Sequence, residues 1–186
     1  PFGLEYLAVG NEDAQTPVFQ ERFKMIYDAV KAKHPEIKVI GNVGPAPDGR
    51  EFEIGWAFAK KHNIEMICEH YYRPPYWFWA NLNRYDNYDR SKAKVFVSEY
   101  AAHDVERRTT LRSALAEAAM MTGFERNGDI VQMACYAPLF GKVGFTQWNP
   151  DLIYFTNTEI APTINYEVQK LFSTNAGNFY LPTTLE

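Results

Sequence analysis

The sequence repeats one pattern five times, a short run of apolar β-forming residues followed by a longer segment. The runs begin near positions 4, 38, 64, 95 and 131, so successive runs start 34, 26, 31 and 36 residues apart. Such lengths are what a crossover between neighbouring parallel strands requires. The spacing therefore predicts an α/β fold in which about five parallel strands alternate with helices.

The runs are continuously apolar, which is typical of strands buried on both faces of a parallel sheet. We predict strands at Leu4–Val9, Lys38–Val43, Ile64–Glu69, Val95–Ser98 and Val131–Tyr136. Apolar periodicity and capping residues predict the helices between them. These helices run from Thr16-Pro17 to His34, Phe52 to His62, Tyr76 to Arg90, Thr109/Thr110 to Arg126, and onward from Pro162, with a loop over Ala137–Ala161.

Two glutamates follow two of the predicted strands. Leu7-Ala8-Val9 leads into Gly10-Asn11-Glu12, and Val95-Phe96-Val97-Ser98 leads into Glu99. Functional groups of parallel α/β folds gather at the carboxyl ends of the strands. Two carboxylates placed there are the arrangement that a retaining glycosidase needs. The spacing alone leaves a second interpretation open, in which both are solvated loop glutamates.

Composition excludes several classes of function. The net charge is −4 and no Lys/Arg block occurs, which argues against nucleic acid as a partner. No apolar run has membrane length, so we expect no membrane partner. Aromatic residues make up 16% of the chain. They fill cores and also line carbohydrate sites, and composition does not separate these two uses.

The sequence predicts neither a metal site nor a cofactor. The cysteines, Cys68 and Cys135, lie in apolar strand-like runs and are interpreted as two buried free thiols. No His/Glu cluster has the spacing of metal ligands, and no glycine-rich phosphate loop occurs. Chemistry performed by carboxylates needs neither group.

Six segments, taken in order, closely resemble family 51 of the glycoside hydrolases. They are Gly10-Asn11-Glu12, His70-Tyr71-Tyr72, Ser98-Glu99-Tyr100-Ala101, the run from Ala114 to Asn127, Trp148-Asn149-Pro150-Asp151-Leu152-Ile153 and the run from Tyr166 to Phe172. This family consists of α-L-arabinofuranosidases, retaining exo-acting enzymes with a (β/α)8 barrel, the TIM-barrel type, and an accessory β-sandwich. The resemblance implies an arabinose-containing oligo- or polysaccharide as the substrate.

The resemblance also implies where the chain lies in the family's barrel. Glu12 resembles the acid/base at the end of barrel strand 4, and Glu99 resembles the nucleophile at the end of strand 7. Residues 1–186 would then form a partial (β/α)8 catalytic domain with strands 4 to 8. Strands 1 to 3 and most of the β-sandwich would be absent.

Further site residues are implied by the same resemblance. Asn11 would hold a sugar hydroxyl, the one at position 2 of the ring, and the alternative is a turn asparagine. His70 and Tyr72 match a His-x-Tyr element whose tyrosine contacts the nucleophile, although Tyr71 competes for that role. Trp148 would form a wall of the pocket, and Asp151 would place a hydroxyl where the family pattern favours an amide.

The aromatic run Tyr76–Trp79 has two interpretations. It is a platform for the leaving group, or it packs against neighbouring helices.

Two rival functions remain open at this point. One is a retaining glycosidase of the same clan with another sugar specificity. The other is a barrel fragment that folds but does not hydrolyse anything, because five parallel strands do not close a barrel. Such a sheet has two open edges, which are prone to pairing, and we therefore expect self-association into a homo-oligomer.

Overall fold

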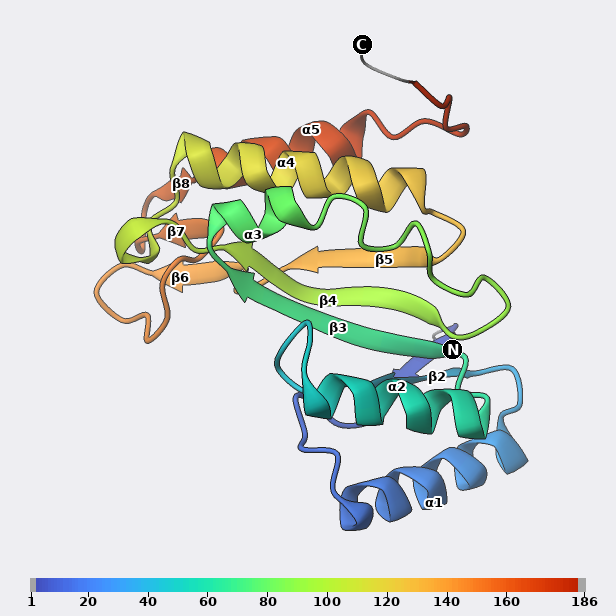
Figure 1. The fold of residues 1–186 in the computed structure, drawn as a ribbon. Helices are drawn as coiled ribbons and strands as arrows, with labels where there is room; N and C mark the ends of the chain where they lie inside the picture. The colour runs from blue at the N-terminus through green and yellow to red at the C-terminus, as the bar shows by residue number, and fades with distance from the viewer. Residues whose placement is uncertain (1–2, 184–186) are drawn as a thin grey trace. The chain divides into compact units, whose positions relative to one another are not determined.

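The computed structural model describes residues 3–183, and its fold is drawn in Figure 1. Five strands form one sheet in chain order: β1 (Tyr6–Ala8), β2 (Lys38–Asn42), β3 (Met66–Arg73), β4 (Lys94–Ala102) and β5 (Val131–Tyr136). β1 pairs with β2 and β2 with β3 in parallel, with Leu7 opposite Val39 and Gly41 opposite Ile67. The predicted α/β class with about five parallel strands is confirmed.

Each predicted strand is present, but two of them are longer than the sequence suggested. β3 continues to Arg73 instead of ending at Glu69. β4 continues to Ala102, so Glu99 lies inside the strand and not at its end. In β3 the additional residues are polar or aromatic, and in β4 the polar Ser98 and Glu99 interrupt the apolar run before Tyr100 and the two alanines continue the strand, so an apolar run underestimated both strands.

The contacts divide the chain into two compact units. Unit 1 comprises Pro1–Tyr71, Asp89–Ser98 and Gln132–Ala134. Unit 2 comprises Tyr72–Tyr88, Glu99–Val131 and Cys135–Glu186. β3, β4 and β5 contribute residues to both units.

Unit 1 is built from the first strands and two helices, α1 (Pro17–Lys33) and α2 (Arg50–His62). Thr16 accepts a hydrogen bond from the Phe19 N–H and Pro17 begins α1, so the predicted cap is confirmed. The core of unit 1 contains Phe23, Val39, Val43, Ala59, Ile64, Ile67 and Ala93. Gly55 lets α2 lie close to β2, because a Cβ there would be 2.9 Å from the Cα of Val43.

Unit 2 contains α3 (Pro75–Ala80), the short 3-10 helix η1 (Val105–Arg107), α4 (Leu111–Arg126) and α5 (Ile164–Thr174). α4 packs against both α3 and α5, and Figure 1 shows α4 and α5 side by side. α4 begins with a capping box in which Thr110 and Ser113 exchange hydrogen bonds between side chain and backbone. The predicted cap and the predicted end of this helix at Asn127 are both confirmed.

Two predictions for unit 2 are wrong. The helix expected over Tyr76–Arg90 is only the six-residue α3, and residues 81–92 form successive turns. The loop expected over Ala137–Ala161 holds three short strands, β6 (Phe140–Lys142), β7 (Ile153–Phe155) and β8 (Ile160–Pro162). They form a second sheet in which β6 and β7 are parallel and β7 and β8 antiparallel. Three-residue strands carry too little periodicity to be recognised in sequence.

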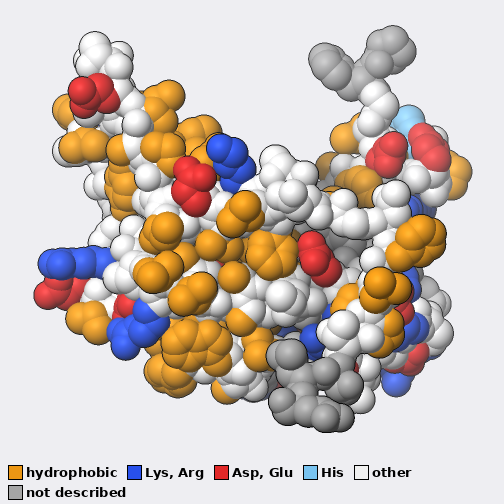
Figure 2. Space-filling view, turned by 90° about the horizontal axis from the view of Figure 1, so that it is seen from above, with side chains coloured by type: hydrophobic (Ala, Val, Ile, Leu, Met, Phe, Trp, Pro, Cys, Tyr) orange, Lys and Arg blue, Asp and Glu red, His pale blue; other side chains and the backbone are white. Residues whose placement is uncertain are grey.

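The outer face of α4 and α5 carries many hydrophobic side chains, which are coloured orange in Figure 2. The exposed ones on these helices are Leu111, Leu115, Ile164 and Leu171. Among the described helices, none has both the length and the hydrophobicity that crossing a bilayer requires.

The burial predicted for the two cysteines is confirmed for one of them. Cys68 is buried, as expected, whereas Cys135 on β5 is exposed, and the two do not form a disulfide with each other.

Candidate active site

The loop that carries Glu12 has a fixed backbone. Gly10 has φ +86°, and a Cβ at this position would lie 2.4 Å from Oδ2 of Asp13 and 2.7 Å from Nδ2 of Asn42. Only glycine meets both conditions without strain. The backbone N–H of Asn11 donates a 2.7 Å hydrogen bond to the same Asp13 oxygen.

Gln15 fastens the end of this loop to β2. Its side-chain Nε2 donates to the carbonyl oxygens of Asp13 and Asn42, each at 3.1 Å. The side chains of Gln15 and Asn42 are both buried, so these bonds are shielded from water. The loop is thereby held against the strand that follows it in the chain.

Glu12 itself has a left-handed backbone conformation, with φ +55°. For a non-glycine residue this conformation is uncommon and often marks a functional position. Its Oε1 lies 2.8 Å from Nδ1 of His70. The Glu12 side chain is 34% exposed while that of His70 is 1% exposed, so the histidine supports a carboxyl group that solvent can reach.

His70 is held from its other side by Ser98, whose Oγ lies 2.8 Å from Nε2. A serine hydroxyl both donates and accepts hydrogen bonds. When Glu12 is ionised, Nδ1–H can donate to it while Nε2 accepts from Ser98. When Glu12 is protonated, Nδ1 can accept from it while Nε2–H donates to Ser98. The arrangement therefore accommodates both protonation states that an acid/base needs.

Glu99 has a strong hydrogen-bond donor beside it. The hydroxyl of Tyr72 donates a 2.6 Å bond to Oε2 of Glu99. A hydrogen bond from a hydroxyl to a carboxylate is short and strong, and it fixes the orientation of the group. The family resemblance implied this contact for Tyr72, whereas its competitor Tyr71 is fully buried and donates to Glu69.

Two further rings surround Tyr72. His103 is stacked on it, with ring centroids 5.3 Å apart and planes 23° apart, and the Trp148 ring lies 5.5 Å away. Burial, together with the positive charge of Arg107, lowers the pKa of His103 to about 4, so its ring is uncharged at neutral pH. The Arg107 guanidinium lies over the Trp148 ring, 5.0 Å from its centroid.

Asp151 is placed differently from a typical sugar ligand. Its side chain is buried and accepts a 2.9 Å hydrogen bond from Oγ1 of Thr146. A Cβ added to Gly141 would lie 2.3 Å from Oδ2 of Asp151, so the carboxylate packs closely on β6. These contacts favour a role in ordering the segment between β6 and β7. Asn11, by contrast, is exposed.

Glu12 and His70 provide a carboxylate oxygen and an imidazole nitrogen, which are atom types that a metal ion binds. The hydrogen bond between them serves carboxylate chemistry equally well. The sequence expectation of no metal and no cofactor therefore stays a prediction.

Sequence reasoning missed three supporting residues. Ser98 directly precedes Glu99, but its contact with His70 joins positions 28 residues apart and depends on how the strands are paired. Gln15 and Asn42 are likewise joined only by the fold. The one available signal was the polar Asn42 at the end of an apolar strand.

The sequence profile of the α-L-arabinofuranosidase C-terminal domain matches residues 79–186, and that of the α-L-arabinofuranosidase 1 domain matches residues 1–90. An extracellular exo-α-L-arabinofuranosidase of Streptomyces chartreusis is 44% identical over 98% of this chain and 22% of its own length. α-L-Arabinofuranosidase 1 of Arabidopsis thaliana is 36% identical over 100% of this chain and 26% of its own.

Solved structures of family 51 α-L-arabinofuranosidases also match the chain. An arabinose-bound family 51 α-L-arabinofuranosidase matches 100% of this chain and 30% of its own, with a TM-score of 0.84 and 34% identity. The thermostable enzyme of Thermotoga petrophila shares the fold, with a TM-score of 0.69 at 17% identity over 95% of this chain and 41% of its own.

The likeness confirms the predicted (β/α)8-barrel type, present here in part. This chain spans about a quarter of the length of the curated relatives named above. By its sequence profile and its relatives, the chain belongs to the α-L-arabinofuranosidases of glycoside hydrolase family 51.

Proposed function

We propose that the protein is a retaining, exo-acting α-L-arabinofuranosidase and that this chain supplies both of its catalytic carboxyl groups. Glu99 is the nucleophile and Glu12 the general acid/base. The substrate is a terminal α-L-arabinofuranosyl group on a polysaccharide side chain, as in arabinoxylan or arabinan. The observation that carries the proposal is the hydrogen bond from Tyr72 to Glu99, because it holds in place the carboxylate that would act as the nucleophile.

In the first step, the Glu99 carboxylate attacks the anomeric carbon while Glu12 gives its proton to the departing glycosidic oxygen. A covalent glycosyl-enzyme forms, and Glu99 loses its charge. In the second step Glu12, now ionised, takes a proton from water, which attacks the anomeric carbon and releases arabinose with its original configuration. His70 and Ser98 follow each change of Glu12 by exchanging donor and acceptor roles.

We assign the remaining predicted residues to the sugar pocket. Trp148 forms a wall next to Tyr72, which its ring contact supports. Asn11 is exposed on the loop of Glu12 and holds a sugar hydroxyl. Asp151 stays assigned as a residue that places a sugar hydroxyl. Its contact with Thr146 more directly supports a role in ordering the segment between β6 and β7.

Kinetics on nitrophenyl α-L-arabinofuranoside test the proposal. Glu12→Ala and Glu99→Ala should each abolish turnover in the full-length protein. Azide should restore activity in Glu99→Ala with inversion, because the anion takes the place of the missing nucleophile. Turnover of a glucoside or galactoside in place of the arabinofuranoside would favour the rival glycosidase of the same clan. An inactive wild-type protein would favour the non-catalytic rival.

The partial domain of barrel strands 4 to 8 and its self-association also stay proposals. The order of the strands leaves β1 and β5 at the edges of the sheet, which supports pairing between copies. A clean monomer in light scattering at high concentration would contradict the self-association.

A further inference from the structure

A groove of about 400 Å³ lies in unit 2 beside the residues that support Glu99. One side is formed by the start of α3 and the residue before it. The other side is formed by residues after β4, up to the first turn of α4. The residues that line it are Pro74, Pro75, Tyr76 and Trp79 on the first side and His103, Asp104, Val105 and Arg112 on the second.

The α3 side of the groove offers aromatic surface to solvent. Tyr76 is 70% exposed and Trp79 is 43% exposed, although both belong to a helix that packs against α4. Of the two interpretations of the run Tyr76–Trp79, packing therefore applies to Phe78, which is fully buried. The faces of Tyr76 and Trp79 remain free for the C–H face of a sugar ring.

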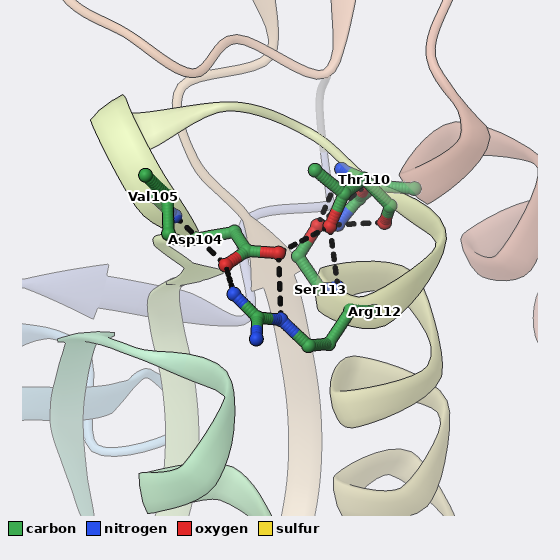
Figure 3. Close-up of polar contacts among 6 residues, drawn as sticks. Asp104, Val105, Thr110, Arg112 and Ser113 are labelled. Atoms are coloured by element: carbon green, nitrogen blue, oxygen red, sulfur yellow. Dashed lines mark hydrogen bonds and ion pairs between the residues drawn. The ribbon is translucent and has the colours of Figure 1, made fainter.

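The opposite side of the groove carries a fixed ion pair, shown in Figure 3. Asp104 is buried and accepts from Nε of Arg112 at 2.9 Å, from the second guanidinium nitrogen Nη2, and from Oγ1 of Thr110 at 2.5 Å. Because the two charges cancel, the pair holds little attraction for an anion. The Arg112 side chain is 57% exposed, and its Nη1 makes no hydrogen bond within residues 3–183. It can therefore donate to a neutral hydroxyl.

His103 connects the groove to the nucleophile. It lines the groove and is also stacked on Tyr72, the residue that donates to Glu99. Its Nε2 is buried without a hydrogen-bond partner in the described part of the chain. The uncharged His103 ring therefore contacts Tyr72 on one side and lines the groove on the other.

We propose that this groove binds a neutral sugar unit of the leaving group, with Tyr76 and Trp79 as the stacking platform and Arg112 as a hydroxyl donor. The proposal rests on the function proposed above. An exo-acting enzyme transfers the terminal sugar, so every further sugar of the substrate belongs to the leaving group. A second saccharide site next to the nucleophile is then a site for that group.

Kinetics with two substrates test the groove in the full-length protein. Trp79→Ala and Tyr76→Ala should each lower kcat/KM about tenfold on an arabinofuranosyl-substituted xylo-oligosaccharide, since one aromatic contact is worth about that factor. On nitrophenyl α-L-arabinofuranoside, whose leaving group is a single ring, kcat/KM should change less than about twofold. Trp79→Phe, which keeps a ring, should lie between Trp79→Ala and the wild type. Phe179→Ala is the matched control, because Phe179 is 89% exposed and outside the groove.

Equal losses on both substrates, or no loss on either, would overturn the groove proposal. Titration of unsubstituted xylo-oligosaccharide into the protein gives a readout that needs no turnover. It should show weaker binding for Trp79→Ala and no preference for an oligosaccharide that carries a uronic acid. Tighter binding of the acidic oligosaccharide would overturn the assignment to a neutral sugar. If the wild type binds the oligosaccharide but hydrolyses no arabinofuranoside, the proposed function fails and the groove stands as a binding site.

Discussion

The hydroxyl of Tyr72 lies 2.6 Å from Oε2 of Glu99 and donates a hydrogen bond to it. The same tyrosine ring is stacked on His103, so its orientation is fixed independently of the carboxylate. A donor that is already in place when the nucleophile is charged needs no rearrangement during the reaction.

Removal of this hydroxyl should slow catalysis without changing the fold. A hydrogen bond to a charged group contributes about 1.5–3 kcal/mol, so Tyr72→Phe should lower kcat/KM on nitrophenyl α-L-arabinofuranoside roughly 10- to 100-fold. Tyr180→Phe, a change of the same kind on an exposed tyrosine, is the control and should have no effect. A Tyr72→Phe variant with wild-type kinetics would show that the bond does not support the reaction.

The serine behind His70 should influence the acid/base. Ser98→Ala removes the hydroxyl that contacts Nε2, so His70 can no longer change roles at equal cost when Glu12 changes its protonation state. We expect kcat/KM to fall about three- to tenfold, as for one neutral hydrogen bond, with a displaced limb in the pH–rate profile. Ser98→Thr keeps a hydroxyl and should preserve the profile. An unchanged profile in Ser98→Ala would rule out this role.

Glu117 on α4 should make stability depend on pH. Its side chain is fully buried, and burial raises its pKa from 4.5 to about 8 although the Ala102 N–H donates to it at 2.8 Å. Between pH 4.5 and 8 the folded chain holds a proton that the unfolded chain has released. The contribution of Glu117 to the free energy of unfolding should therefore fall as the pH rises through this window, by at most about 1.4 kcal/mol per pH unit.

Denaturant unfolding of the wild type and of Glu117→Gln at several pH values between 4.5 and 8 measures this contribution. The amide of Glu117→Gln does not titrate. The free energy of unfolding of the wild type minus that of Glu117→Gln should therefore decrease as the pH rises. A difference that is constant, or that rises with pH, would contradict the protonated state of the buried carboxyl.

The cap of α4 should contribute measurably to stability. Thr110 accepts from the Ser113 N–H and donates to Asp104, so Thr110→Ala removes two hydrogen bonds at the start of the helix. Loss of an N-cap lowers the free energy of unfolding by about 1–2 kcal/mol. Thr109→Ala, one residue earlier and outside the cap, should change it by less than about 0.5 kcal/mol. Equal effects of the two variants would contradict the capping role.

The sequence predicted those parts of the fold that local signals specify. The cap at Thr16-Pro17, the cap at Thr110 and the end at Asn127 depend on residues a few positions apart, and all three are confirmed. The helix predicted over Tyr76–Arg90 was wrong because its aromatic residues are consistent with helix, turn or core. The sequence did not predict β6, β7 and β8, because three-residue strands are specified by their partners and not by their own pattern.

In the candidate site, too, contacts between residues far apart in the sequence were not indicated by local signals. The contact of Tyr72 with Glu99 was predicted from a family resemblance, not from the residues alone, which would have suggested a core tyrosine. The contacts of His70 with Glu12 and Ser98 join positions 58 and 28 residues apart, and no local pattern indicates them. The turn at Gly10 was visible as a glycine, but its crowding by Asp13 and Asn42 was not.

The most direct test of the central claim is to trap the covalent intermediate. A 2-deoxy-2-fluoro-arabinofuranosyl substrate with a good leaving group should accumulate the glycosyl-enzyme, because fluorine slows both steps and the activated leaving group restores the rate of the first step only. Mass spectrometry of the digested protein should then place one sugar on the peptide that contains Glu99, and none in Glu99→Ala. A label on any other carboxylate, or full turnover with inversion and no labelled peptide, would contradict the assignment of Glu99 as the nucleophile.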